Sequence, residues 1–430
     1  MNPSTQTPDG APFTLLVRGA SAVLTADGPE SDDGGLTLAA RAGDAVGIRG
    51  GEVSWIGPET ALPPGLLTQG TEVLDAEGGL VVPGFVDCHS HIVYAGDRSE
   101  EFALRALNVD AAGITRAGGG ILSTVFATRA QDEDALVRLA LPRLERLLAH
   151  GVTTLEVKSG YGLTTKDELK MLRVVRRLGS LQPVTLIPTF LWLHALPPEW
   201  ANDRAGYLTL GRQTLEAVVR EGLAEFADAF VEKGAFTVEE ARSFLTEARA
   251  LGLRPRLHVD QLTAGRGAEL AAELGALSAD HLECVSPEGI AALAAAGVTA
   301  VLMPVATLVL RRPAYAPGKA LREAGVRVAL ASNVNPGSAA TENLSLSLGL
   351  GCLLNGLTPE EALLGVTRWG AQALGRVEVG RLRVGGAADL LVLGCREVAH
   401  LAAHLGVRHA RAVVKAGRVV LRSTDAARCV

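Results

Sequence analysis

The sequence is poor in cysteine and has no pattern of paired cysteines. Its 430 residues include only five, and none of them belongs to a C-x-x-C motif. They are Cys88, Cys284, Cys352, Cys395 and Cys429. An odd number without paired spacing argues against a disulfide framework and is typical of a reducing compartment. Residues 1–10 also lack the basic and apolar regions of a signal peptide. We therefore expect a cytoplasmic protein.

The chain also lacks an excess of charge and an uninterrupted apolar segment. The formal net charge is −6 with both signs interspersed, so we expect no nucleic-acid-binding surface. Residues 291–310 carry no charge and approach the length of a membrane span. Because Gly297 and Pro304 interrupt this segment, it is predicted to form an alanine-rich helix followed by a strand. We expect a soluble protein that does not insert into a membrane.

The distribution of apolar segments predicts the fold. Hydrophobic residues make up 48% and charged residues 20% of the chain, which suits one large domain and a smaller one. Between residues 91 and 334, short apolar runs alternate with longer helical patterns. The runs are 152–157, 184–193, 226–231, 255–259, 277–281, 298–303 and 326–331. With the run before His89 they give eight strands, which favours an α/β fold of the (β/α)8 TIM-like barrel type. The alternative, an open doubly wound sheet, lacks a G-x-G-x-x-G motif after the first strand.

The two ends of the chain have a different pattern, with short strands separated by turns. We predict that residues 1–80 and 378–430 form a small β-sandwich domain built from both termini. Residues 81–377 are then predicted to form the barrel.

Histidines mark the ends of several predicted strands. His89 and His91 are two residues apart at the end of the first run, so on an extended backbone they point to one face and could share a metal ion. His194, His258 and His281 close three further runs. Because the carboxyl ends of barrel strands meet at one face, these five histidines are predicted to share one pocket. The other four are expected to be surface or packing residues. They are His150, His400, His404 and His409.

Three histidines could form a catalytic metal centre. His89, His91 and His258 would give three nitrogen ligands and leave a position for water. A bound ion lowers the pKa of its water far below that of bulk water, towards about 7. No Walker A loop, kinase motif or G-x-S-x-G elbow offers a competing mechanism, so hydrolysis of an amide-like or amidine-like bond is predicted.

Three further features each leave alternatives open. His281 could be another ligand, a proton shuttle, a hydrogen-bond donor to a substrate carbonyl or a purely structural residue. Arg98 could bind a carboxylate, or it could form a salt bridge with Glu100 or Glu101. The turn Asn335–Ser338 could bind a carboxylate through its N–H groups, or it could be only a turn.

Several motifs resemble the imidazolonepropionase family of the amidohydrolase superfamily, over nearly the whole chain. They are residues 83–91, 95–98, 118–121, 151–163, 194–198, 267–270, 278–283 and 335–338. K-S-G-Y-G-L together with D-H-L-E and N-P-G-S is a specific combination. The resemblance implies that the lactam ring of 4-imidazolone-5-propanoate is opened to N-formimidoyl-L-glutamate in histidine degradation.

The resemblance also implies a set of site residues and one metal ion per chain, Zn or Fe. His89, His91 and His258 would bind the metal. Arg98, Tyr161 and His194 would contact the small-molecule substrate, and a homodimer is a further expectation. Four residues would complete the pocket, namely Gln261, Asn335, Gly337 and Ser338.

The chain departs from the family pattern at strand eight. The pattern has an aspartate there as metal ligand and proton acceptor, and this chain has Asn333. An amide oxygen can coordinate a metal, but it brings no negative charge and accepts no proton usefully. Three interpretations follow. The chain is an active imidazolonepropionase in which Asn333 is a weak metal ligand and His281 the catalytic group that handles protons. Alternatively, it is a related cyclic-amide hydrolase or deaminase, or a metal-poor homologue that binds ligand without turnover.

Two smaller points concern neighbouring residues. Trp192 and Leu193 precede His194 where the family usually has small residues, so they either pack behind the strand or narrow the pocket. A binuclear site bridged by a carboxylated Lys233 is disfavoured, since the resemblance points to one metal.

Overall fold

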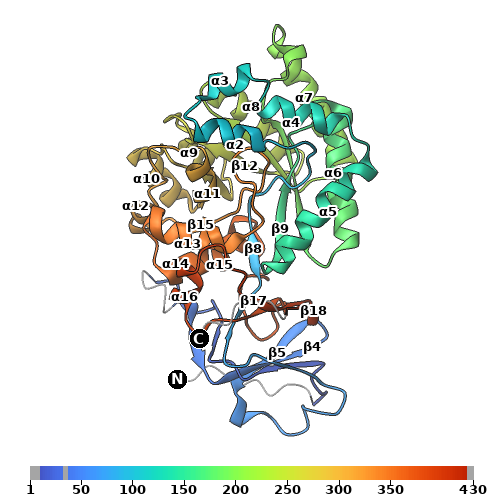
Figure 1. The fold of residues 1–430 in the computed structure, drawn as a ribbon, viewed down its shortest axis with the longest axis vertical. Coiled ribbons are helices and arrows are strands. Elements are labelled where there is room, and N and C mark those ends of the chain that lie inside the picture. Colours follow the sequence, from blue (N-terminus) through green and yellow to red (C-terminus); the bar gives the residue numbers. More distant parts are fainter. Residues whose placement is uncertain (1–9, 32–36, 424–430) are drawn as a thin grey trace.

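A parallel barrel forms the larger part of the molecule (Figure 1). The computed structural model describes residues 10–31 and 37–423. Eight strands lie side by side in sequence order, and all their ladders are parallel. They are β8 (Phe85–Asp87), β9 (Val152–Lys158), β10 (Thr185–Leu193), β11 (Phe226–Val231), β12 (Arg254–Val259), β13 (Ser278–His281), β14 (Thr299–Leu302) and β15 (Val328–Leu330).

Backbone hydrogen bonds just beyond β8 and β15 join the first strand to the last. The N–H of Asn333 donates to the carbonyl of His89 (3.0 Å), and the N–H of His91 donates to the carbonyl of Val334 (2.8 Å). The barrel therefore closes at the level of the histidine pair, and the predicted (β/α)8 fold class is confirmed.

Helices cover the outside of the barrel between successive strands. They are α5 (Glu133–Ala149), α6 (Thr165–Leu181), α7 (Arg204–Arg220), α8 (Val238–Ala250), α9 (Gly267–Glu273) and α10 (Pro287–Ala296). Side chains cap several of them, as at α8, where Thr237 and Glu240 form a reciprocal capping box. With helices outside and side chains inside, the strands are buried on both faces and are largely apolar.

The remaining barrel helices lie before α5 and after β14. Three short helices follow β8 and cover the upper end of the barrel in Figure 1: α2 (Ser99–Ala106), α3 (Ala111–Arg116) and α4 (Ile121–Arg129). The later ones are α11 (Pro304–Val309), α12 (Gly318–Glu323), α13 (Leu344–Asn355), α14 (Pro359–Gly365) and α15 (Arg368–Ala373).

The uncharged segment 291–310 is divided between several elements. Helix α10 ends at Ala296, Gly297 follows in the left-handed conformation, and β14 begins at Thr299. The predicted helix and strand are thus present, and α11 follows at Pro304. Among the described residues, no helix is both long and apolar enough to cross a membrane.

Strands from both ends of the chain form two further sheets, at the lower end of Figure 1. The first has the order β5 (Glu52–Pro58), β4 (Asp44–Arg49), β1 (Leu15–Arg18) and β6 (Glu72–Asp75). The second has the order β18 (Arg418–Arg422), β17 (Ala410–Lys415), β16 (Leu390–Leu393), β7 (Leu80–Pro83), β2 (Ala22–Leu24) and β3 (Ala40–Ala42). Helix α16 (Val398–Ala403) connects β16 to β17.

The two sheets share one hydrophobic core, as expected for a sandwich. Leu15 and Ile48 of the first sheet belong to the same buried cluster as Val81 and Leu390 of the second. Antiparallel pairing of β16 with β7 brings Leu391 opposite Val82, so the two ends of the chain are joined directly. The boundaries at residues 80/81 and 377/378 stay predictions.

Candidate metal centre

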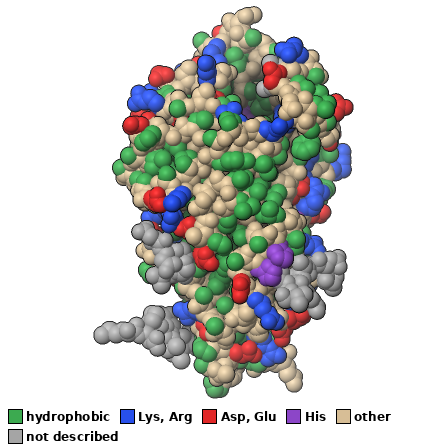
Figure 2. Space-filling view, turned by 60° about the vertical axis from the view of Figure 1, so that its left-hand side comes forward, with side chains coloured by type: hydrophobic (Ala, Val, Ile, Leu, Met, Phe, Trp, Pro, Cys, Tyr) green, Lys and Arg blue, Asp and Glu red, His purple; other side chains and the backbone are tan. Residues whose placement is uncertain are grey.

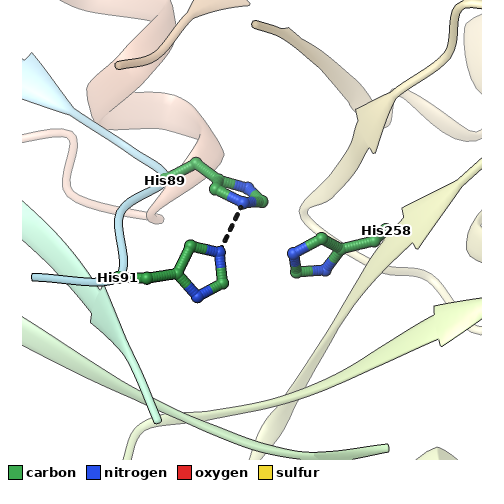
Figure 3. Close-up of side chains that lie close together, drawn as sticks. All are labelled: His89, His91 and His258. Atoms are coloured by element: carbon green, nitrogen blue, oxygen red, sulfur yellow. Dashed lines mark hydrogen bonds between the residues drawn. The ribbon is translucent and has the colours of Figure 1, made fainter. Parts of the chain in front are cut away.

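Three buried histidines converge at the carboxyl end of the barrel (Figure 3). His89 and His91 follow β8, and His258 lies near the end of β12. One ring nitrogen of each lies within 4.8 Å of the others, and Nε2 of His89 is 3.3 Å from Nε2 of His91. Their residue exposures are 0%, 3% and 4%. At this distance one of the two Nε2 atoms can donate a hydrogen bond to the other, but both cannot donate at once.

Two carboxylates fix the orientation of these rings. Nδ1 of His89 lies 2.7 Å from Oδ2 of Asp280, and Nδ1 of His258 lies 3.0 Å from Oδ1 of Asp228. A carboxylate beside Nδ1 holds the hydrogen on that atom and leaves Nε2 with its lone pair, the arrangement typical of metal-binding histidines. Nε2 of His258 is buried without a hydrogen-bond partner among the described residues.

Electrostatics keep the rings neutral. Burial lowers the pKa of His89 well below its ordinary range, and the positive charge of Lys158 lowers it further. Burial also lowers the pKa of His91 well below that range, with a contribution from His89. For His258, burial lowers the pKa even though Asp228 opposes the shift. Neutral imidazoles with free lone pairs are the form that binds a metal ion, so the three residues fit a single ion.

A buried ionic network lies behind the histidines. Lys158 donates to Oε1 of Glu156 and to Oδ2 of Asp228, each at 2.7 Å. Arg256 donates to Oδ2 of Asp280 at 3.0 Å. All five side chains are fully buried. Burial alone would lower the pKa of Lys158, but the carboxylates of Asp228 and Glu156 raise it above its ordinary value.

From the sequence, Lys158 is expected near the pocket at the end of its strand, but none of these network residues is assigned a catalytic, substrate-binding or metal-binding role. The signal for them is present in the sequence, because Glu156, Asp228, Arg256 and Asp280 lie within runs predicted to be buried strands. Lys158 directly follows such a run. A buried charge requires a partner, so such residues are expected to meet in space.

A cavity of about 120 Å³ opens beside the histidine triad. It brings together most of the predicted site residues, from six different βα segments. Its lining consists of His91, Arg98, Ile121, Tyr161, His194, Phe230, His258, Gln261, His281, Asn333, Asn335 and Ser338. His89 and Gly337 are absent from this lining. His89 is fully buried, and Gly337 lies against the guanidinium of Arg98.

Glu168 shapes the loop that carries Tyr161. Its carboxylate accepts hydrogen bonds from the N–H groups of Gly160, Gly162 and Leu163, at 3.0, 2.7 and 2.9 Å. The ring of Tyr161 then lies 5.4 Å from the ring of His194. Three backbone donors on one buried carboxylate make the loop rigid, so the position of Tyr161 in the cavity is fixed.

His194 is neutral and has a defined tautomer. Its Nδ1 donates to the carbonyl of Gly160 at 2.9 Å, which leaves Nε2 as the acceptor. Burial, with a contribution from His258, lowers the pKa of His194 to about 3. Its ring stacks on that of His91 at 5.4 Å.

His281 has an unusual backbone conformation next to the triad. Its φ is +87° and that of Leu282 is +70°, in the left-handed region that non-glycine residues rarely adopt. The ring lies 5.4 Å from that of His258 and 5.6 Å from that of His89. Such strain persists where the surroundings hold a residue in place, and it is common at functional sites.

The position of Arg98 is compatible with both predicted roles, a salt bridge and contact with a ligand carboxylate. Its Nε and Nη2 donate to the two carboxylate oxygens of Glu101, at 2.7 and 2.9 Å. The predicted salt bridge is therefore present, with Glu101 and not with Glu100 as the observed partner. Arg98 also lines the cavity, so it remains available to a ligand.

In the turn at residues 335–338, the side chain of Asn335 accepts hydrogen bonds from backbone N–H groups of the same turn. Oδ1 of Asn335 accepts from the N–H groups of Gly337 and Ser338, both at 2.8 Å. Nδ2 of Asn335 donates to Oγ of Ser338 at 2.9 Å. These backbone donors are already engaged, which favours the simpler interpretation of this motif as a turn. The hydroxyl of Ser338 still lines the cavity.

Asn333 lies in the cavity next to the triad, with a φ of +54°. Asparagine tolerates the left-handed conformation better than most residues. Its Oδ1 is 3.3 Å from Nδ2 of Asn335. Trp192 and Leu193 are fully buried and are not part of the cavity lining, so they pack behind the strand. Trp192 stacks on Tyr207 with ring centroids 4.7 Å apart.

Lys233 and the other four histidines lie outside this site. Lys233 is exposed. His400, His404 and His409 form a separate ring cluster, with centroids 4.3 and 6.3 Å apart, after β16.

The barrel, the appended sandwich and the converging histidines together define the class of the amidohydrolases. A family model described as "Amidohydrolase family" matches residues 97–421. The structure is similar to 5-methylcytosine deaminase from Klebsiella pneumoniae, with a TM-score of 0.72 and 16% identity, covering 95% of this chain and 97% of that one. It is also similar to atrazine chlorohydrolase from Arthrobacter aurescens TC1, complexed with zinc, with a TM-score of 0.70 and 19% identity. That match covers 96% of this chain and 97% of the other.

Sequence comparison gives a narrower assignment. The chain is 57% identical to imidazolonepropionase of Myxococcus xanthus, over 95% of this chain and 97% of that protein. It is 50% identical to the imidazolonepropionase of Anaeromyxobacter sp. strain K, over 95% of this chain and 96% of that protein. The chain belongs to the imidazolonepropionase family.

Proposed function

We propose that this protein hydrolyses the lactam ring of 4-imidazolone-5-propanoate to N-formimidoyl-L-glutamate, a step of histidine degradation. The observation that carries the proposal is the identity of 57% to an imidazolonepropionase over nearly the whole chain. In this reaction water adds to the lactam carbonyl carbon, the carbon–nitrogen bond breaks, and the departing nitrogen takes up a proton. The product gains a carboxylate.

One metal ion, Zn or Fe, is proposed to bind to His89, His91 and His258. Their neutral rings and the unpartnered Nε2 of His258 support this ligand set, and a zinc complex is known for one structural neighbour. When bound, such an ion supplies a Lewis acid and lowers the pKa of water. Asn333 would add an amide oxygen as a weak, uncharged ligand.

His281 is the residue to which we assign proton transfer. Asn333 cannot accept a proton, and the ring of His281 lies close to those of His89 and His258. Nδ1 of His281 is buried, has no hydrogen-bond partner among the described residues and lies 3.8 Å from Oε1 of Glu283. We therefore assign Nε2 as the atom that receives the proton from water and passes it to the lactam nitrogen.

The other cavity residues are proposed to orient the substrate. The positive charge of Arg98 suits the propanoate, and Ser338 lies in the same cavity. Tyr161 and His194 form an aromatic wall for the planar ring. Gln261 offers an amide group, Asn335 holds Ser338 in place through its hydrogen bonds, and Gly337 makes room for Arg98.

The test is hydrolysis of freshly prepared 4-imidazolone-5-propanoate by the purified protein, with bound metal measured in the same sample. We expect turnover with about one metal per chain. His258→Ala should lose both metal and activity, whereas His400→Ala, outside the cavity, should keep both. Little metal and no turnover would contradict the proposal and indicate a homologue that only binds ligand. Turnover of another cyclic amide or amidine alone would indicate a related hydrolase or deaminase.

The expected location is the cytoplasm, and the expected assembly is a homodimer. Cys88, Cys284 and Cys352 form no disulfide, which supports a reducing compartment. Analytical ultracentrifugation would test the assembly, and a monomer at micromolar concentration would contradict it.

A further inference from the structure

Three charged side chains form one group at the upper end of the barrel. Glu101 lies on α2 between Arg98, which precedes the helix, and Arg105, which lies one turn further along. Arg105 donates from Nη2 to Oε2 of Glu101 at 2.9 Å and from Nη1 to the carbonyl of Gly337 at 2.8 Å. The side-chain exposures of Arg98, Glu101 and Arg105 are 13%, 5% and 13%. We call these three residues the arginine clamp.

Every favourable acceptor position of Glu101 is used. Oε1 accepts from Nε of Arg98 and from the N–H of Gly120, and Oε2 accepts from both arginines. Burial alone would raise the pKa of Glu101, but hydrogen bonds from Arg98 and Gly120 hold it below its ordinary value. Glu101 therefore stays ionised, and its bidentate pairing fixes the plane of the Arg98 guanidinium.

The same pairing leaves one nitrogen of Arg98 for a ligand. Nε and Nη2 are bound to Glu101, and among the described contacts Nη1 has no hydrogen-bond partner. Gly337 lies directly against this nitrogen, since a Cβ built on Gly337 would be only 2.2 Å from Nη1. The guanidinium is thus held between a carboxylate and a glycine, and Arg98 lines the cavity.

The clamp also carries a net positive charge only because of Arg105. Arg98 and Glu101 alone would form a neutral pair, with little attraction for a second carboxylate. Arg105 adds one positive charge to this pair, although it lies outside the cavity of about 120 Å³ beside the histidines. Arg98 lines both that cavity and a neighbouring one of about 430 Å³, whereas Glu101 and Arg105 line only the second. Figure 2 shows a hollow at the upper end of the molecule with charged side chains on its rim.

We infer that the arginine clamp is the carboxylate-recognition unit of the site, in which Glu101 orients Arg98 and Arg105 supplies the charge that lets Arg98 bind a carboxylate. The inference rests on the proposed function in taking that carboxylate to be the propanoate of the substrate. Arg105 and Glu101 are positioning residues, because they act through Arg98. They set the affinity for the acid group and leave the chemistry at the lactam carbonyl unchanged.

The test replaces Arg105 by Gln, with Arg105→Lys as the conservative variant. We expect Arg105→Gln to raise the KM for 4-imidazolone-5-propanoate by about tenfold and to change kcat by less than about twofold, since a partly buried charge near a ligand charge is lost. Arg105→Lys should recover most of the affinity. Arg116→Gln is the matched control, because Arg116 lies on neighbouring α3 but is exposed and outside the clamp.

Calorimetry with two inert probes separates charge recognition from a general structural effect. We expect Arg105→Gln to weaken binding of imidazole-4-propanoate about tenfold and to leave 4-methylimidazole unaffected. Equal weakening of both probes, or a loss confined to kcat, would overturn the inference. If the unaltered protein does not hydrolyse 4-imidazolone-5-propanoate, the proposed function fails. The probe comparison still tests the clamp, because it requires no turnover.

Discussion

Replacing Lys158 by Met should strongly destabilise the barrel. Its ammonium group is fully buried and donates to Glu156 and Asp228 at 2.7 Å each, and it lies 3.7 Å from Oδ2 of Asp280. Methionine has a similar length and removes the charge. The three carboxylates would then share only Arg256 as a buried cation within this network.

The expected cost follows from the two lost contacts. A hydrogen bond to a charged group contributes about 1.5–3 kcal/mol, and breaking a buried ion pair costs about 3–5 kcal/mol. We therefore expect the free energy of unfolding to fall by about 3–5 kcal/mol. Because Asp228 also orients His258, metal affinity should fall by about 10- to 100-fold.

Urea unfolding followed by tryptophan fluorescence measures the first effect, and competition with a chelator measures the second. Lys319→Met is the matched control, since Lys319 is 68% exposed, and it should change stability by less than about 0.5 kcal/mol. The double variant Lys158→Met/Glu156→Gln removes a carboxylate together with the cation and should recover part of the loss. A loss below about 1 kcal/mol for Lys158→Met alone would refute the view that this lysine holds the network together.

Three further predictions concern residues in and around the cavity. Asn333→Asp should raise kcat/KM by about 10²–10⁴-fold, because it adds a charged ligand and a proton acceptor; an unchanged rate would mean that His281 alone is sufficient. Gly337→Ala should raise KM about tenfold or more, because its Cβ would displace the Arg98 guanidinium, whereas Gly179→Ala, with open space around its Cα, should leave steady-state kinetics unaltered. Glu101→Gln should destabilise the protein to the same extent between pH 6 and pH 8. The pKa of Glu101 is lowered from 4.5, so the ionised carboxylate stabilises the folded protein above pH 4.5, and this stabilisation is lost as the pH falls through the lowered pKa. Unfolding measured at pH 7 and at pH 4 should therefore show a larger effect of Glu101→Gln at pH 7, and an equal effect would contradict the view that Glu101 is an ionised partner of the arginines.

The barrel and the histidine triad could be predicted from the sequence because both depend on local patterns. Apolar runs that alternate with helical patterns define the strands, and the helices force a parallel sheet. The carboxyl ends of all strands then lie at the same end of the barrel, so histidines that are far apart in the chain are expected to meet there. That His89 and His91 lie on the same face could be predicted from the two-residue period of an extended chain alone.

The partners of these residues could not be predicted, because they depend on the register between strands. Pairing of β12 with β13 places His258 opposite Asp280, yet it is His89 that approaches the Asp280 carboxylate, from β8. No sequence pattern contains that relation. For Arg98, the spacing to Glu101 fitted a salt bridge and the loop position fitted a ligand site. Only the three-dimensional arrangement shows that the side chain paired with Glu101 also lines the cavity.

The closure of the barrel beside the histidine pair has a consequence for the ribosome-bound chain. The backbone of His89 and His91 is bonded to that of Asn333 and Val334, which are synthesised much later. Until the last strand has left the ribosome and docked, the early pair has neither His258 in place nor a fixed backbone. If these histidines hold the metal as proposed, we expect metal loading to be a late event that follows closure of the barrel. Metal uptake by ribosome-stalled chains of increasing length should accordingly begin only after residue 334 has emerged.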